Sequence, residues 1–382
     1  MELCLVTDHA CNLRCSYCYT GEKSPQAMSE ETAARAVDFA LARDEKALSL
    51  SFFGGEPTLR MGFVERVTEY ATSQLRRKNP TAVLVVHLNT NATRIDERVE
   101  AFVRSCHLVN AFVSIDGPEQ IHNRHRLDVL GRGSYASTRQ GLSRLVQAGA
   151  RAVVLAVINP DTAGSLGEIA TELLSLPVHR ANVVCNLRAN WDEAALEKLR
   201  RGLAGAAEVW KAAFRAGKTI HFEPFTTKIL SHLHAAMPCG SRCHLGYDEL
   251  VVTPNGRFYS CGELVGEDCD PTFSIGDLTN GIDTAKLVKL REQKNRIEQN
   301  CADCELRERC SSACGCKHVA LTGEFGKVTE TLCDTEQAFI QAADSVAEAL
   351  YREQCDAFLE FFYRKSWAPS TPQAYVQIRH KA

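Results

Sequence analysis

The sequence predicts an α/β fold: a partial (β/α)6 barrel of the TIM type, followed by a small cysteine-rich domain and a C-terminal helix. Over the first half of the chain, short apolar runs alternate with amphipathic helical segments, a pattern typical of parallel sheets with crossover helices. A dense group of cysteines then lies between residues 239 and 333. The chain has 382 residues, which exceeds one typical domain, so a large domain and a smaller one are expected.

Each predicted strand is short and rich in Val, Leu, Ile or Phe. The strands are expected at 3–6, 48–53, 83–88, 109–115, 152–158 and 181–186. Helices are expected at 29–43, 62–77, 96–105, 134–148 and 163–176, the first with Ser29 as its N-cap. Six βα units in a row predict an incomplete barrel, whose chemistry belongs on the loops after the strands.

The remaining chain divides by composition. Asp192 is a suitable N-cap for helices between 191 and 236, and a helix is expected from 335 to 367, before a mobile tail from Pro369. The predicted domains are a barrel at 1–190, a helical bridge at 191–238, a cysteine-rich domain at 239–335, and a C-terminal helix and tail at 336–382.

Composition excludes several classes of partner. Hydrophobic residues are 45%, charged residues 24% and the net charge is -3, so nothing attracts the chain in bulk to nucleic acid or to an anionic membrane. The seventeen cysteines are grouped at short spacings, which predicts metal binding in a reducing compartment. No signal peptide begins the chain, and no run approaches the ~18 apolar residues of a membrane span. A cytoplasmic protein is expected.

Three cysteines follow the first strand: Cys11, Cys15 and Cys18, with three residues between the first pair and two between the second. Three thiolates on one small loop can hold three irons of a 4Fe-4S cube and leave the fourth iron open. A small molecule can chelate that iron through its amine and carboxylate. The alternative is a zinc knuckle in which His9 completes a tetrahedron.

This run, with Tyr17 just before the third cysteine, resembles the radical S-adenosylmethionine (radical SAM) signature. The resemblance implies that the reduced cluster cleaves S-adenosylmethionine (SAM) to methionine and a 5'-deoxyadenosyl radical, which takes a hydrogen atom from a substrate. It also implies a reductant such as flavodoxin or ferredoxin.

Further motifs stand at the ends of the next strands. Glycines 54 and 55 lack Cβ atoms that would block a ligand, and Glu56 offers a counter-charge to an ammonium group. Without the resemblance, each motif has an ordinary structural explanation. Residues 54–57 could form a simple turn, and Ser114 and Asp116 are common turn formers at the end of a strand. The basic loop that contains Arg126 could be a solvated surface loop. The resemblance implies a cofactor site made of Tyr17, Gly54, Gly55, Glu56, Pro57, Asn91, Ser114, Asp116 and Arg126.

Seven later cysteines and Gly256 have the order and spacing of the SPASM domain, which holds two auxiliary 4Fe-4S clusters. The resemblance implies that one cluster is bound by Cys301, Cys304, Cys310 and Cys333, and the other by Cys243, Cys261 and Cys314. Cys239 is the natural fourth ligand of the second cluster, or else that position is open for substrate. The alternative is a zinc ribbon formed by the four cysteines from 301 to 314. Three 4Fe-4S clusters and SAM are therefore the expected cofactors.

SPASM relatives commonly act on peptides. The resemblance implies a maturase that forms a thioether or carbon-carbon cross-link in a ribosomally made peptide. Sulfatase-maturing relatives carry an Asp directly after the cysteine that corresponds to Cys261, and here that residue is Gly262. Oxidation of a sulfatase Ser or Cys is therefore the alternative, together with oxidation or epimerisation of another peptide or small molecule.

The first strand begins at Leu3, so no leader-binding domain is expected within the chain and a separate leader-binding protein is an expected partner. Two readings without catalysis stay open: an electron carrier with three closed clusters, and a zinc-dependent binding module.

Overall fold

The computed structural model describes residues 2–43, 48–234, 243, 245–246, 249–296 and 299–364. Its contacts divide the chain into two compact units. The first unit comprises Met1–Ser114, His122–Val153 and His244–Arg291, and the second comprises Ile115–Ile121, Val154–Cys243 and Glu292–Ala382. The domain boundaries at 190, 238 and 335 stay a prediction.

The first unit is built on a sheet whose strands β1 to β4 are parallel and follow one another in sequence order. β8 pairs with β1 in parallel, with Glu2 beside Glu249, and continues into antiparallel strands β9 to β11. These added strands were not predicted, because their two to four residues show no clear periodicity. The strands are β1 (Glu2–Val6), β2 (Ser49–Phe53), β3 (Val85–Thr90), β4 (Leu108–Ser114), β8 (Glu249–Val252), β9 (Arg257–Tyr259), β10 (Gly276–Asp277) and β11 (Gly281–Ile282).

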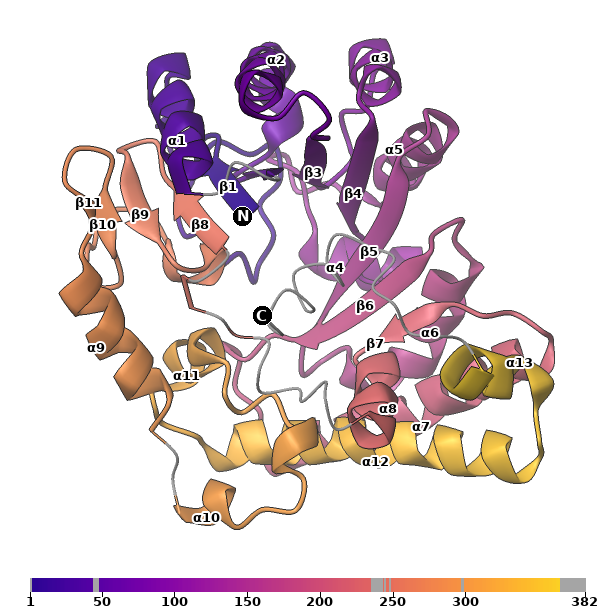
Figure 1. The fold of residues 1–382 in the computed structure, drawn as a ribbon. Helices are drawn as coiled ribbons and strands as arrows, with labels where there is room; N and C mark the ends of the chain where they lie inside the picture. The colour runs from indigo at the N-terminus through magenta and orange to yellow at the C-terminus, as the bar shows by residue number, and fades with distance from the viewer. Residues whose placement is uncertain are drawn as a thin grey trace. The chain divides into compact units, whose positions relative to one another are not determined.

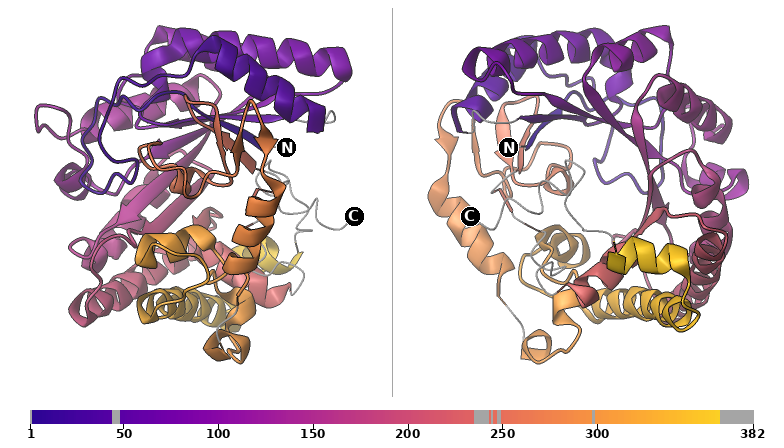
Figure 2. Two further views of the ribbon diagram at one scale, coloured as in Figure 1. Left: turned by 90° about the vertical axis from the view of Figure 1, so that its left-hand side faces the viewer. Right: turned by 45° about the vertical axis from the view of Figure 1, so that its right-hand side comes forward.

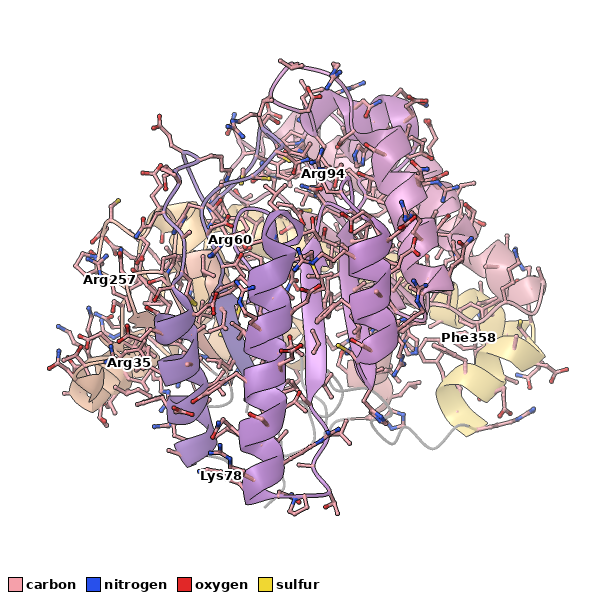
Figure 3. The ribbon with its side chains drawn as sticks, turned by 90° about the horizontal axis from the view of Figure 1, so that it is seen from above. Arg35, Arg60, Lys78, Arg94, Arg257 and Phe358 are labelled. Atoms are coloured by element: carbon pink, nitrogen blue, oxygen red, sulfur yellow. The ribbon has the colours of Figure 1, made fainter. Side chains whose placement is uncertain are left out.

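Helices α1, α2, α3 and α5 lie side by side against one face of this sheet (Figure 1), and both views of Figure 2 show α1 and α2 as a layer above the strands. Ser29 accepts a hydrogen bond from the Thr32 amide, which confirms it as the cap of α1. Figure 3 shows Arg60 at the start of α2 and Lys78 at its end. The helices of this unit are α1 (Glu30–Arg43), a 3-10 turn (Pro57–Arg60), α2 (Met61–Lys78), α3 (Glu97–Ser105), the end of α4 (Glu119–His125, shared with the second unit), α5 (Tyr135–Gln147) and most of α9 (Thr284–Lys294).

The second unit contains the end of β5, then β6 and β7, covered by long helices. Asp192 accepts a hydrogen bond from the Ala195 amide and caps α7 as predicted. α12 packs along α7 and α8. The elements are β5 (Arg151–Ile158, shared with the first unit), a 3-10 turn (Ala163–Ser165), α6 (Leu166–Ser175), β6 (Arg180–Cys185), α7 (Glu193–Arg215), β7 (His221–Glu223), α8 (Phe225–Leu233), α10 (Gln299–Ala302), α11 (Gly315–Thr322), α12 (Glu330–Arg352), α13 (Asp356–Leu359) and a π-helical turn (Glu360–Arg364).

Two predictions for this unit are wrong. The stretch 191–236 is not wholly helical, since β7 pairs with β6 in parallel. The single helix expected from 335 to 367 is broken after Arg352, where Gln354 has a φ of 53°. This turn brings Phe358 and Phe362 onto Phe214, so aromatic packing in the core overrides the local helical pattern. The tail from Pro369 lies outside the described residues.

No helix in the described part of the chain combines the length and apolarity needed to cross a membrane.

Candidate active site

The loop between β1 and α1 carries Cys11, Cys15 and Cys18, all half-buried. Its backbone pairs with the last residue of α4 and the segment after it: the Ser16 amide donates to the His125 carbonyl at 3.0 Å, and the Arg14 amide to the Leu127 carbonyl at 2.7 Å. The structure therefore holds the three cysteines on one anchored loop within the first unit.

Each of the three sulfurs accepts a hydrogen bond. The Leu13 amide lies 3.4 Å from Cys11 Sγ, Arg126 Nη1 lies 3.9 Å from Cys15 Sγ, and Lys23 Nζ lies 2.9 Å from Cys18 Sγ. Burial raises the pKa of Cys18, but the Lys23 ammonium and neighbouring donors bring it below its ordinary value. Burial raises the pKa of Cys11 to about 11, and the Leu13 amide opposes that rise. Amide donors and cations favour thiolates, which is what a cysteine-bound iron-sulfur cluster requires.

Lys23 is a residue that sequence reasoning missed. It stands five positions beyond Cys18, and no spacing rule connects a lysine at that distance with a cysteine site. Its ammonium also contacts Thr20 Oγ1 at 2.5 Å, so the loop folds back on itself around Cys18.

Gly54 and Gly55 bring the loop after β2 against the cluster loop. The Gly55 amide donates to Asp8 O at 2.8 Å, and the Glu56 amide to Ala10 O at 2.9 Å. A Cβ on Gly55 would lie 1.8 Å from Ala10 O, and Gly54 has a φ of +123°. In this structure the glycines are required by backbone contact between two loops, a reason that the sequence did not indicate.

Glu56 is 1% exposed and accepts four hydrogen bonds from its own chain. Its Oε1 accepts from the amide and hydroxyl of Thr58 and from the hydroxyl of Thr90, and its Oε2 accepts from the Asn91 amide at 2.7 Å. Burial raises the pKa of Glu56, and these donors oppose that rise. The carboxylate thus joins the loops after β2 and β3, and Oε2 keeps capacity for another donor. Its pairing with an ammonium group stays a prediction.

Asn91 extends this connection to the cluster loop. Its Nδ2 donates to Asn12 Oδ1 at 3.0 Å and lies 3.8 Å from Cys11 Sγ, while its Oδ1 accepts from Thr93. The Thr138 hydroxyl of α5 donates to the Asn91 carbonyl at 2.9 Å. Asn91 is buried, and its hydrogen bond to Asn12 fixes the position of the cysteine loop.

Arg126 is 7% exposed, which contradicts the solvated-loop reading for this side chain. Its guanidinium stands 5.2 Å from the centre of the Tyr17 ring, and the Tyr17 ring contacts His125 at 5.9 Å between centroids. His122 is fully buried, and its Nε2 hydrogen-bonds Ser134 Oγ at 3.0 Å. Residues 122–126 therefore pack against the cysteine loop, with Arg126 in contact with Tyr17 and Cys15.

The two strand-end residues fall in different units. Ser114 is the last residue of β4 and is half-buried. Asp116 belongs to the second unit, is 1% exposed, and accepts a hydrogen bond from the Val157 amide of β5 at 3.0 Å. Their predicted contact with a ribose stays a prediction.

Most of the auxiliary cysteines lie in the second unit. The thiols of Cys243 and Cys316 both hydrogen-bond that of Cys314, and the pKa of Cys314 is lowered by these contacts. Cys316 stands two positions after Cys314 and is itself buried. Cys261 lies in the first unit, and Cys239 lies outside the described residues. Across the described ranges, no three His, Cys, Asp or Glu side chains are placed to hold a single metal ion.

Comparison with known proteins identifies the family of this chain. Residues 5–173 match the model of the radical SAM superfamily. The chain is 30% identical over 329 residues to a cysteine-type anaerobic sulfatase-maturating enzyme of Clostridium perfringens, which covers 80% of this chain and 85% of that protein.

Two solved structures have a similar fold. Native anSMEcpe with bound AdoMet has a TM-score of 0.77 at 18% identity, covering 92% of this chain and 99% of that one. Streptococcus suis SuiB bound to precursor peptide SuiA has a TM-score of 0.60 at 16% identity, covering 87% and 75%. The predicted α/β partial barrel is confirmed.

The fold and the cysteine loop together define an enzyme that uses a 4Fe-4S cluster and SAM. The chain belongs to the radical SAM superfamily, in the branch of SPASM-type enzymes that mature peptides and proteins.

Replacing Glu56 by alanine is expected to weaken SAM binding by roughly 1.5 to 3 kcal/mol, the range for a hydrogen bond to a charged group. The change removes the buried carboxylate that orders the loops carrying Asn91 and the cysteines. Equilibrium dialysis under anaerobic conditions measures the affinity. Glu69→Ala, on the exposed face of α2, is the control. Unchanged affinity in Glu56→Ala would remove Glu56 from the cofactor site.

Proposed function

We propose that this enzyme is a peptide maturase that abstracts hydrogen from a ribosomally made peptide and forms a thioether or carbon-carbon cross-link. The observation that carries the choice is Gly262, which follows Cys261 where sulfatase-maturing relatives carry an aspartate used as a base. A Cβ at this position would lie 3.6 Å from the Phe53 ring. Because glycine has no side chain, no carboxylate is available at residue 262 to take a proton from a seryl or cysteinyl substrate.

Cys11, Cys15 and Cys18 are proposed to hold the SAM-binding cluster, and their hydrogen-bonded sulfurs support this assignment. When bound and reduced, the cluster would supply the one electron that breaks a carbon-sulfur bond of SAM, giving methionine and the 5'-deoxyadenosyl radical. Lys23 and Arg126 balance thiolate charge.

The protein's other groups are proposed to bind and orient SAM. Glu56 and Asn91 hold the loops beneath it, and the remaining acceptor capacity of Glu56 suits the SAM ammonium. Ser114 and Asp116 face its ribose and carboxylate. Arg126, buried beside Tyr17, attracts a carboxylate of SAM or of the substrate.

The auxiliary ligands are proposed as two sets. Cys301, Cys304, Cys310 and Cys333 hold one cluster, and Cys239, Cys243, Cys261 and Cys314 hold the other, which makes three 4Fe-4S clusters per chain. The substrate gives a hydrogen atom to the 5'-deoxyadenosyl group. As the new bond forms, the substrate would release a proton and one electron, and an auxiliary cluster held by these cysteines would accept that electron, so the atoms and electrons balance.

The proposed partners follow from this chemistry. A flavodoxin or ferredoxin supplies the low-potential electron, and a separate leader-binding protein presents the peptide. A reducing, cytoplasmic location suits the seventeen cysteines, which are grouped at short spacings.

Oxidation of a sulfatase Ser or Cys is the second candidate. It is favoured by the anaerobic sulfatase-maturating relative that covers 80% of this chain. The two candidates differ in what they do to a cysteine. A cross-linking enzyme keeps the sulfur in the product, whereas a sulfatase-maturing enzyme replaces it by oxygen.

Mass spectrometry separates them. Reduced enzyme and SAM are incubated with two probes: a sulfatase-derived peptide with a single cysteine, and the short peptides encoded beside its gene. We expect loss of hydrogen with retained sulfur in a gene-neighbour peptide, together with fragmentation that spans a new bond. Exchange of sulfur for oxygen in the sulfatase peptide would overturn the proposal in favour of the second candidate. SAM cleavage without change in either probe would contradict both.

A further inference from the structure

Lys23 brings a positive charge into direct contact with a predicted cluster ligand. Its Nζ lies 2.9 Å from Cys18 Sγ, within the range of a hydrogen bond, whereas Arg126 Nη1 lies 3.9 Å from Cys15 Sγ. A hydrogen bond from an ammonium group to a negatively charged acceptor is stronger than one between neutral groups. Of these two cations, Lys23 is the one in closer contact with a cysteine sulfur.

Thr20 orients this ammonium group. Thr20 Oγ1 lies 2.5 Å from Lys23 Nζ and 3.2 Å from Cys18 Sγ, and the threonine is 8% exposed. The ammonium, the hydroxyl and the sulfur therefore contact one another in pairs. Within the described residues, the hydrogen-bond partners of Lys23 are these two side chains, and neither is a carboxylate. Lys23 acts on Cys18 as a direct donor, an effect that does not depend on the net charge of the region.

The segment that carries Lys23 is tied to the rest of the first unit on both sides. Residues 26–28 run antiparallel to residues 7–9, and two backbone hydrogen bonds of 2.8 and 3.0 Å join them. On the other side, the Glu22 amide donates to Glu267 Oε1 at 2.9 Å. The position of the ammonium beside the cysteine loop is therefore set by tertiary contacts as well as by the chain between Cys18 and Lys23.

A donor of this kind acts unequally on the two redox states of an iron-sulfur cluster. Hydrogen bonds to the sulfurs are among the features that set the reduction potential of a cluster. One added electron makes the cluster more negative, so a nearby ammonium stabilises the reduced form more than the oxidised form. The charge of Lys23 also reaches Cys11, where it opposes the rise in thiol pKa that burial causes. Its influence thus extends to two of the three predicted ligands.

We propose that Lys23 raises the reduction potential of the SAM-binding cluster by donating a hydrogen bond from its ammonium group to the Cys18 sulfur, with Thr20 as the residue that orients it. In this step one electron passes from the flavodoxin- or ferredoxin-type reductant to the cluster, and no covalent bond changes. The inference rests on the proposed assignment of Cys11, Cys15 and Cys18 as ligands. It does not depend on which peptide is modified, so failure of the cross-linking assay would leave it intact.

The test is a potentiometric titration, followed by EPR, of full-length protein reconstituted with iron and sulfide under anaerobic conditions. The SAM-binding cluster is recognised by the EPR signal that changes when SAM is added, because its open iron binds SAM. At a fixed solution potential, Lys23→Met is expected to lower the ratio of reduced to oxidised cluster about tenfold, which is about 59 mV for one electron. Lys23→Arg keeps the charge and should restore most of this shift.

Lys289→Met is the matched control, because this lysine lies on the exposed side of α9 in the same unit. Its potential should equal that of the wild type. An unchanged or higher potential in Lys23→Met would overturn the proposal. If Lys23→Met does not assemble the cluster, Thr20→Val decides the question: it keeps the ammonium but removes the hydroxyl that orients it, so a smaller downward shift supports the proposal and an unchanged potential overturns it.

A second measurement separates an effect on the potential from damage to the structure. SAM cleavage by Lys23→Met should fall with dithionite as the reductant and recover with titanium(III) citrate, which is a stronger reductant. A loss that titanium(III) citrate does not repair would overturn the proposal in favour of a structural role. Wild-type protein without a signal that responds to SAM would overturn the inference together with the ligand assignment on which it rests.

Discussion

Simultaneous replacement of Cys11, Cys15 and Cys18 by alanine is expected to abolish SAM cleavage and to remove about four of about twelve irons per chain. The three thiolates are the proposed protein ligands of the SAM-binding cluster, and no alanine can replace a thiolate. None of the proposed auxiliary ligands is replaced, and those from 301 to 333 lie in the other unit, so the auxiliary clusters should remain. Iron determination and chromatography of 5'-deoxyadenosine measure the two effects.

A matched triple variant controls for the loss of thiols as such. Cys106, Cys269 and Cys355 are exposed or half-buried and lie outside the predicted ligand sets. Their joint replacement by alanine should preserve iron content and SAM cleavage. If the Cys11, Cys15 and Cys18 variant retained all its iron, the loop after β1 would not be a cluster site.

Gly55→Ala is expected to destabilise the protein by about 3 kcal/mol or more and to impair assembly of the nearby cluster. The added Cβ would lie 1.8 Å from the Ala10 carbonyl oxygen and 3.0 Å from the Ala10 amide nitrogen. Both atoms belong to backbone, so no side-chain rotation relieves the contact. The cluster loop must move away, and the hydrogen bonds to Asp8 and Ala10 are lost with it.

Gly164→Ala is the control for this prediction. Its added Cβ would meet no atom closer than 3.9 Å. The free energy of unfolding should therefore stay within about 0.5 kcal/mol of the wild-type value. Chemical denaturation of the reconstituted proteins and their absorbance near the iron-sulfur bands measure both quantities. A Gly55→Ala protein with native stability and a full cluster would show that the two loops do not approach as the structure indicates.

Much of the fold was predictable because its signals are local. The runs that became β1 to β6 are each short and apolar, and the helices between them carry apolar residues at helical spacing, as on α2 with Phe63, Val67 and Ala71. Caps such as Ser29 and Asp192 also depend on a few neighbouring residues. Predictions of this kind need no knowledge of distant contacts.

The pairing of β8 with β1 could not be predicted in the same way. Residues 249–252 lie more than two hundred positions from β1 in the chain, and a four-residue run does not reveal its partner. The break after Arg352 was missed for a related reason: the aromatic residues that pack around Phe214 come from α7 itself, with Trp210, and from the distant C-terminal segment, with Phe358 and Phe361.

By itself, the sequence determined the type of site, because thiol ligands must be spaced closely to share one loop and the spacing is written in neighbouring residues. The tertiary structure decided what surrounds each ligand. Lys23 reaches Cys18, Glu56 binds the loop after β3, and Glu336 ties Ser311 to α12. Hydrogen bonds act over about 3 Å. Which donors come that close depends on how the strands and helices pack, and spacing along the chain does not contain that information.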